Sequence, residues 1–196
     1  MIPHVHQRHV SCMSAAHQRR LTGENISTET IKLLARYNSH ANQEMGRILA
    51  ELTVEEWNKP LGGYFPTIRS LASHIFSGDL AYLKRFAALR PFAYVDHPLF
   101  QRTIAKGEVL FPAFSDYEPD RKALDTVFTR FAEEVTPADL AKRLRFTNYQ
   151  GVEQEKDFGG LVLHTFNHQT HHRGQVSLYL DILGKKNDFS GIAPLV

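Results

Sequence analysis

The chain has 196 residues, of which 42% are hydrophobic, 11% aromatic and 22% charged, a composition typical of one globular domain. It excludes disorder throughout and collagen-like repeats, and no apolar run is long enough to cross a bilayer, so we expect a soluble protein. The net charge of +2 arises in residues 1–20, which hold three arginines and no acid, because the remainder has 20 basic and 21 acidic residues. Since the remainder shows no basic patch that would neutralise phosphates, nucleic-acid binding is disfavoured.

The single cysteine, Cys12, cannot form an internal disulfide, which indicates a reducing compartment and a cytoplasmic location. Residues 1–26 show neither a periodic pattern nor a hydrophobic signal region, so we predict a flexible N-terminal leader there. Its four histidines lack the rigid frame that catalysis needs, although they can bind metal adventitiously. Residues 27–196 are expected to form the folded domain.

Four helical patterns follow the leader. The first begins at Ser27 or Thr28, and apolar residues recur in it at spacings of three and four: Ile31, Leu34, Tyr37, Ala41, Met45, Ile48 and Leu52. The second is expected from about Pro66–Thr67 to Arg90–Pro91, the third after Asp120, and the fourth from about Phe158 to Leu183, with Gly184 after its end.

The connections between these helices differ in length and kind. Thr53 and Glu56 form a capping-box pattern for a short helical turn that carries Trp57. The proline-rich residues 91–119 are too long for a tight turn and predict a crossover, while alternation around Tyr149-Gln150-Gly151 predicts a two-stranded hairpin. The expected fold is therefore all-α: a four-helix bundle with a long crossover between helices 2 and 3 and a small hairpin before helix 4.

The most informative feature is a cluster of four histidines within nine residues of the fourth helix: His164, His168, His171 and His172. At about 100° per residue they share one face, which we expect to continue through Leu161, Tyr179, Ile182 and Leu183 and to point into the bundle. Two imidazoles four residues apart can reach one ion, either as His164 with His168 or as His168 with His172. Periodicity alone does not decide between these pairs.

A third ligand must come from another helix, and His74 of the second helix is the best candidate. Gly78, one turn later, leaves room beside it for an approaching helix or ion. His40 lies off the apolar stripe of the first helix and His97 lies in the crossover, so both are expected at the surface. The alternative to a metal site is a set of hydrogen-bonded core histidines, which is costly to satisfy with few carboxylates nearby.

The run from His164 to Val176, HTFNHQTHHRGQV, strongly resembles the closing signature of the DinB family of metal-binding four-helix bundles. The segments YNSHANQEM and IRSLASHIFSGDLAYLKR, from the first and second helices, resemble the family as well. The resemblance covers about residues 27–190. It implies that His74, His168 and His172 hold the metal, and it removes the pair of His164 with His168.

On this assignment His164, His171 and Gln175 become neighbours of the metal site, and Tyr82 could line the approach to it. Arg173 is expected to face away and make a structural ion pair. Neither Asp79, about 140° from His74 by helical phase, nor Glu44 can be assigned as a general base. Imidazole ligands suit zinc and nickel alike, so one divalent ion of either metal is expected per chain.

The family includes thiol-dependent S-transferases and proteins described as metal-dependent hydrolases. The resemblance therefore implies a metal-dependent enzyme that acts on a small electrophilic substrate in a stress or damage response, with a low-molecular-weight thiol as one partner. The alternative is a metal-binding stress protein without turnover. A homodimer is also expected, because Val162, Phe166 and Leu180 lie opposite the histidines and would need burial on a second face.

Overall fold

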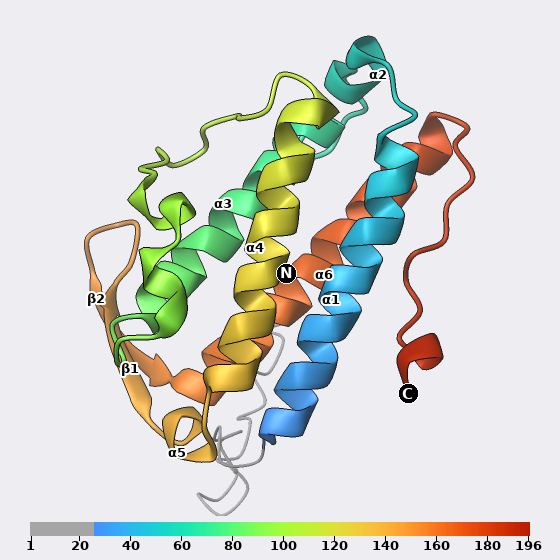
Figure 1. The fold of residues 1–196 in the computed structure, drawn as a ribbon. Helices are drawn as coiled ribbons and strands as arrows, with labels where there is room; N and C mark the ends of the chain where they lie inside the picture. Colours follow the sequence, from blue (N-terminus) through green and yellow to red (C-terminus); the bar gives the residue numbers. More distant parts are fainter. Residues whose placement is uncertain (1–25) are drawn as a thin grey trace, which may run out of the picture.

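The computed structural model describes residues 26–196, and this part of the chain is mostly helical, in agreement with the predicted all-α class (Figure 1). The long helices are α1 (Thr28–Leu49), α3 (Ile68–Phe86), α4 (Phe114–Glu134) and α6 (Phe158–Ile182). Shorter elements are α2 (Val54–Asn58), α5 (Pro137–Leu140), the 3-10 helices η3 (Ala93–Asp96), η4 (Pro98–Gln101) and η5 (Ala193–Leu195), and the strands β1 (Arg143–Thr147) and β2 (Glu153–Asp157). The predicted leader, residues 1–26, lies outside the described residues except for Ile26.

The four long helices pack along one another. Helices α1 and α3 each contact both α4 and α6. In Figure 1, α1 and α6 run upwards while α3 and α4 run downwards, because residues 87–113 return along the length of the molecule between α3 and α4. Within the described residues, none of the helices is both long enough and apolar enough to cross a membrane.

Several helix ends lie where capping signals predict them. The Ser27 hydroxyl accepts a hydrogen bond from the Thr30 N–H and caps α1, and Thr53 and Glu56 form the predicted capping box of α2. The Asp157 carboxylate likewise accepts from the Gly160 N–H at the start of α6. The predicted hairpin is also present, with Arg143 paired to Asp157 and Thr147 to Glu153.

Helix α4 begins at Phe114, so the prediction that it follows Asp120 was wrong. Pro119 suggested a boundary, but it lies in the second turn, where proline removes one backbone hydrogen bond. The first turn is held by the Asp116 carboxylate, which accepts from the Ala113 N–H at 3.0 Å, and by the rings of Phe114 and Tyr117 against Trp57. These contacts outweigh the local cost of the proline.

The predicted inward face of α6 was right for His172 and Tyr179, which are buried, but wrong for other residues. Val162, Phe166 and Leu180, expected on the outside, are 0%, 3% and 0% exposed, whereas Ile182, expected inside, is 56% exposed. The reason is that the buried face of α6 contains the polar residues Thr165, Gln169 and Arg173. Hydrophobic periodicity assigns these three residues to the surface. It therefore predicts a buried face that is rotated about the helix axis from the observed one. Val162, Phe166 and Leu180 therefore do not support a dimer, because the chain's own core buries them.

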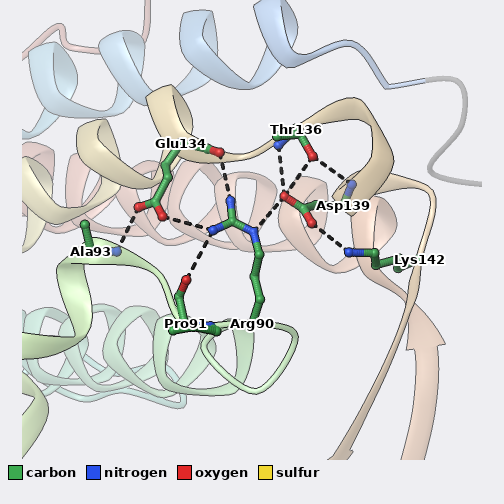
Figure 2. A network of polar contacts seen from close by, with 7 residues as sticks. All are labelled: Arg90, Pro91, Ala93, Glu134, Thr136, Asp139 and Lys142. Carbon is green, nitrogen blue, oxygen red and sulfur yellow. Dashed lines mark hydrogen bonds and ion pairs between the residues drawn. The ribbon is translucent and has the colours of Figure 1, made fainter.

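Arg90 fixes the start of the long connection to the end of α4 (Figure 2). Its guanidinium donates to the Glu134 carboxylate at 3.0 Å, to the Glu134 backbone carbonyl at 2.9 Å and to Asp139 at 3.0 Å. Glu134 also accepts from the backbone N–H of Ala93. The charge-assisted contacts join residues 90–93 to residues 134–139, two segments that are far apart in sequence.

Asp139 is the titrating member of this network. Partial burial opposes its ionisation, but hydrogen bonds from Lys142, Thr136 and Arg90 lower the pKa of Asp139 to about 2. Because the unfolded carboxyl titrates near about 3.9, the stabilisation is present above that pH and is lost as the pH falls towards 2.

We predict that Asp139→Asn lowers the free energy of unfolding at about pH 5, and that its difference from the wild type shrinks as the pH falls to about 2. Urea denaturation of both metal-free proteins across this range measures the difference. A difference that is the same at both ends would contradict the assigned role of Asp139.

Candidate metal centre

The structure brings His74 of α3 together with His168 and His172 of α6. The three Nε2 atoms lie 3.1 Å from one another, at the corners of an equilateral triangle. His168 and His172 are one turn apart on α6, and α6 packs against α3. The described residues contain this one group of three side chains positioned to hold a metal ion.

Gly78 makes the close approach of the two helices possible. A Cβ atom at this position would lie 3.1 Å from Cε1 of His168, closer than ordinary packing allows. The sequence predicts that Gly78 leaves room beside His74, and the occupant of that room is the ring of His168. A glycine inside a helix has a cost in stability, and here the imidazole contact accounts for it.

The three imidazoles are held in their neutral form. Burial, together with the charge of His172, lowers the pKa of His74 to about 4, and burial together with the neighbouring histidines lowers that of His168 to about 3. Burial also lowers the pKa of His172, against the effect of its contact with Gln175. At neutral pH each ring therefore has a nitrogen lone pair available, as metal ligation requires.

Gln175 orients the ring of His172. Its Oε1 lies 2.7 Å from Nδ1 of His172, and because an amide oxygen only accepts, the imidazole must donate its Nδ1–H. The Nε2 lone pair of His172 then points to the centre of the triangle. Among the described residues, the buried Nδ1 atom of His168 has no hydrogen-bond partner, so Nε2 makes the polar contacts of that ring.

Phe65 is a neighbour of the centre that the sequence analysis missed. Its ring stacks on His74, with centroids 4.3 Å apart and an angle of 25°, and its edge meets His172. The Tyr179 hydroxyl contacts the carbonyls of Gly62 and Phe65 and so ties this segment to α6. The sequence shows only a helix-breaking segment here, Pro60-Leu61-Gly62-Gly63, and nothing in it points to the histidines.

The other histidines and Tyr82 lie around the triangle without joining it. His164 and His171 are exposed. The His164 ring lies 6.1 Å from that of His168 and 5.4 Å from Tyr82, and the His171 ring lies 4.8 Å from that of His172. His97 accepts a hydrogen bond from the Leu99 N–H in the long connection, away from the centre.

The triangle fits a transition-metal ion. Tetrahedral ligands about 2.0–2.1 Å from an ion lie about 3.3 Å apart, close to the observed 3.1 Å. Three neutral nitrogens whose lone pairs converge at this distance repel one another, and a cation relieves that repulsion. The donor set thus suits a divalent ion that accepts imidazole ligands, as zinc and nickel both do.

A second polar group, also missed by the sequence analysis, lies in the core between the other helices. Arg121 donates to Asp79 at 2.6 Å and to Asp125 at 2.8 Å, and Asn38 and Asn42 donate to the same oxygen of Asp125. Asp79 is 0% exposed, and burial raises its pKa while Arg121 opposes the rise. Its carboxylate faces Arg121 and not His74, in agreement with the angle of about 140° between the two residues on the helix.

Arg173 belongs to this buried layer and faces away from the metal centre as predicted, but the predicted ion pair was wrong. It is 3% exposed, donates to the amide oxygens of Asn38 and Asn42 and to the Thr170 hydroxyl, and lies over the Tyr37 ring. No ion pair in the described part of the chain includes it. The partners are neutral amides because the nearby carboxylates, Asp125 and Asp79, are already bonded to Arg121.

Comparison with known proteins agrees with this arrangement. The model of the DinB family matches residues 25–188, a segment that includes the three histidines and all four long helices. The chain is also 25% identical over 154 residues to Protein DinB of Bacillus subtilis (strain 168), an alignment that covers 75% of this chain and 82% of that protein. The chain therefore belongs to the DinB family.

Proposed function

We propose that the protein binds one divalent transition-metal ion through His74, His168 and His172 and acts with it as an enzyme on a small electrophilic substrate. The observation that carries this proposal is the triangle of Nε2 atoms 3.1 Å apart. Three protein ligands are typical of catalytic rather than structural zinc, because structural sites use four. An ion held in this way keeps a position for a thiol or a water and makes either one easier to deprotonate.

The surroundings support access from one side. His74 and His168 are partly exposed, and the exposed His164 and His171 flank them on α6. On the other side, Phe65 covers His74. We therefore place the approach of the substrate beside His164, His171 and Tyr82, whose polar groups can hold a small molecule without displacing the ligands.

The single acid of α3 favours a thiol over water as the nucleophile. Hydrolysis needs a base that takes a proton from water, and Asp79, the one acid on α3, is buried against Arg121. A thiol, with an ordinary pKa of about 8.5, gives up its proton far more readily than water. A thiol S-transferase is thus the preferred activity, with a hydrolase second and a non-catalytic metal-binding stress protein as the alternative.

Three further proposals concern the setting of this function. We propose that the four long helices form a four-helix bundle with a crossover, as in the DinB family. We also propose that the protein works in the cytoplasm, where its single cysteine stays reduced. We also retain the homodimer, now supported by the exposed Leu163, Leu178 and Ile182 on α6. Light scattering distinguishes a dimer from a monomer of 22.4 kDa.

We predict that purified protein binds one more equivalent of zinc or nickel than the variants His168→Ala and His172→Ala. Each variant removes one of three ligands, while the leader histidines contribute equally to all proteins and cancel in the difference. Elemental analysis after dialysis gives the metal content, and His171→Ala on the same helix is the matched control. Equal metal content in wild type and both ligand variants would refute the assignment.

Gln175→Leu is expected to weaken metal binding about 10- to 100-fold, because the Nδ1–H of His172 loses its acceptor. Gln175→Glu keeps an acceptor oxygen and should bind metal at least as tightly as the wild type. Competition with a chelator of known affinity measures both. If Gln175→Leu binds metal as the wild type does, Gln175 does not orient the ligand.

The metal-loaded protein is expected to transfer a thiol to small electrophiles, in a panel that combines glutathione, bacillithiol or mycothiol with alkyl halides, epoxides and activated esters. His172→Ala should reduce turnover to background while its circular dichroism stays helical, because the apolar core lies outside the site. Equal inactivity of the loaded and metal-free proteins across the panel would favour the non-catalytic alternative.

A further inference from the structure

A cavity of about 480 Å³ lies between α1 and α4. The metal centre lies between α3 and α6, so two different helix pairs hold the two features (Figure 1). None of the three histidines lines the cavity. It is therefore separate from the proposed catalytic site, and nothing in the proposed function accounts for it.

One part of the cavity wall is apolar. Gly46 of α1 and Ala50, the residue after its end, line the cavity opposite Phe114 and Tyr117 on α4. A Cβ atom built on Gly46 would have Phe114 Cζ at 3.8 Å as its nearest neighbour, which is ordinary van der Waals contact. The absence of a side chain at Gly46 keeps this space open, and a flat hydrocarbon or aromatic group matches its lining.

The other part of the wall carries polar groups whose hydrogen-bonding capacity is incompletely used. Arg121 is 3% exposed and donates from both terminal nitrogens, but within the described residues its Nε–H has no acceptor. The hydroxyl of Tyr117, 1% exposed, feels the charge of Arg121 but has no hydrogen-bond partner of ordinary geometry among the same residues. The hydrogen bonds to Asp125 from Asn38, Asn42 and Arg121 all reach Oδ1, so the described residues supply none to Oδ2.

The charge of this polar part favours a neutral ligand. Arg121 lies between the carboxylates of Asp79 and Asp125, so its positive charge is already balanced. The other two cations of the wall, Arg47 and Lys122, are paired with Glu44 and Glu118, so the lining does not call for an anion. Burying an additional charge next to this group would cost far more than burying a neutral amide. The unpartnered donors need an acceptor, and Oδ2 of Asp125 needs a donor.

We propose that the cavity between α1 and α4 is a second ligand site, which takes a small neutral molecule with an apolar body and an amide-type edge, such as a primary carboxamide or a lactam. The amide oxygen accepts from Tyr117 and Arg121, and the amide N–H donates to Asp125. The apolar body lies over Gly46 against Phe114. Binding there does not require the metal ion.

Benzamide is the probe that tests this proposal on the full-length protein. In a titration followed by NMR chemical-shift changes we expect benzamide to bind with a dissociation constant of about 1 mM, as befits so small a ligand. Benzoate and benzylamine, which have the same shape but carry a charge, should bind at least about tenfold more weakly. Tighter binding of either charged compound would overturn the proposal.

Two variants place the binding in the cavity. Gly46→Leu fills the space without a backbone clash and improves helix propensity, so the protein should fold and lose benzamide binding. Gly174→Leu is the matched control, because Gly174 lies on the exposed side of α6 with open space around it. Unchanged binding by Gly46→Leu, or equal loss in Gly174→Leu, would contradict the assigned position.

Tyr117→Phe tests the polar contacts. Since the hydroxyl has no hydrogen-bond partner of ordinary geometry in the described structure, its removal should leave thermal stability unchanged or higher, while benzamide binding weakens about fivefold. His168→Ala should bind benzamide as the wild type does. A His168→Ala protein that no longer binds benzamide would refute a metal-independent site, whereas failure of the metal-content test above would leave this result untouched.

Discussion

The close approach of α3 to α6 at Gly78 is the contact on which the candidate centre depends. The ring of His168 occupies the space that a side chain at this position would fill, and its Nε2 thereby comes within 3.1 Å of His74 on the other helix. His172 then meets the same point because it lies one turn further along α6. A methyl group at position 78 would push the two helices apart and move His168 and His172 away from His74.

The interior of the protein is divided between two polar groups of different charge. The histidines are neutral imidazoles, and their remaining need is a cation. The other group holds two positive charges, on Arg121 and Arg173, and two negative charges, on Asp79 and Asp125, and the asparagines of α1 bind Arg173. Buried charges are tolerable only when paired, and this layer joins all four long helices through such pairs and through amide hydrogen bonds. The two groups therefore differ: the histidines are positioned to bind a metal ion, whereas the charged layer is hydrogen-bonded except for atoms of residues that line the cavity.

Local signals predicted much of the fold. Capping residues such as Ser27 and Thr53 act within one turn, so the sequence reveals them, and the same holds for the hairpin around Gly151. The ligand candidates His74, His168 and His172 were also visible, because the i, i+4 spacing restricts geometry and the family resemblance selected the pair. What the sequence could not reveal depends on contacts between distant segments. Pro119 lies inside α4 because aromatic packing on Trp57 holds the first turn, and α6 is rotated because Gln169 and Arg173 are buried as part of the core face.

The central claim is that three imidazole nitrogens hold a single ion at one point between α3 and α6. A crystal structure of the full-length protein, with diffraction recorded above and below the absorption edge of the bound metal, tests this directly. The account predicts one anomalous peak about 2.0–2.1 Å from Nε2 of His74, His168 and His172, with a further ligand that does not come from these three residues. A peak at other residues of the folded domain, or coordination through Nδ1 of any of the three histidines, would contradict it.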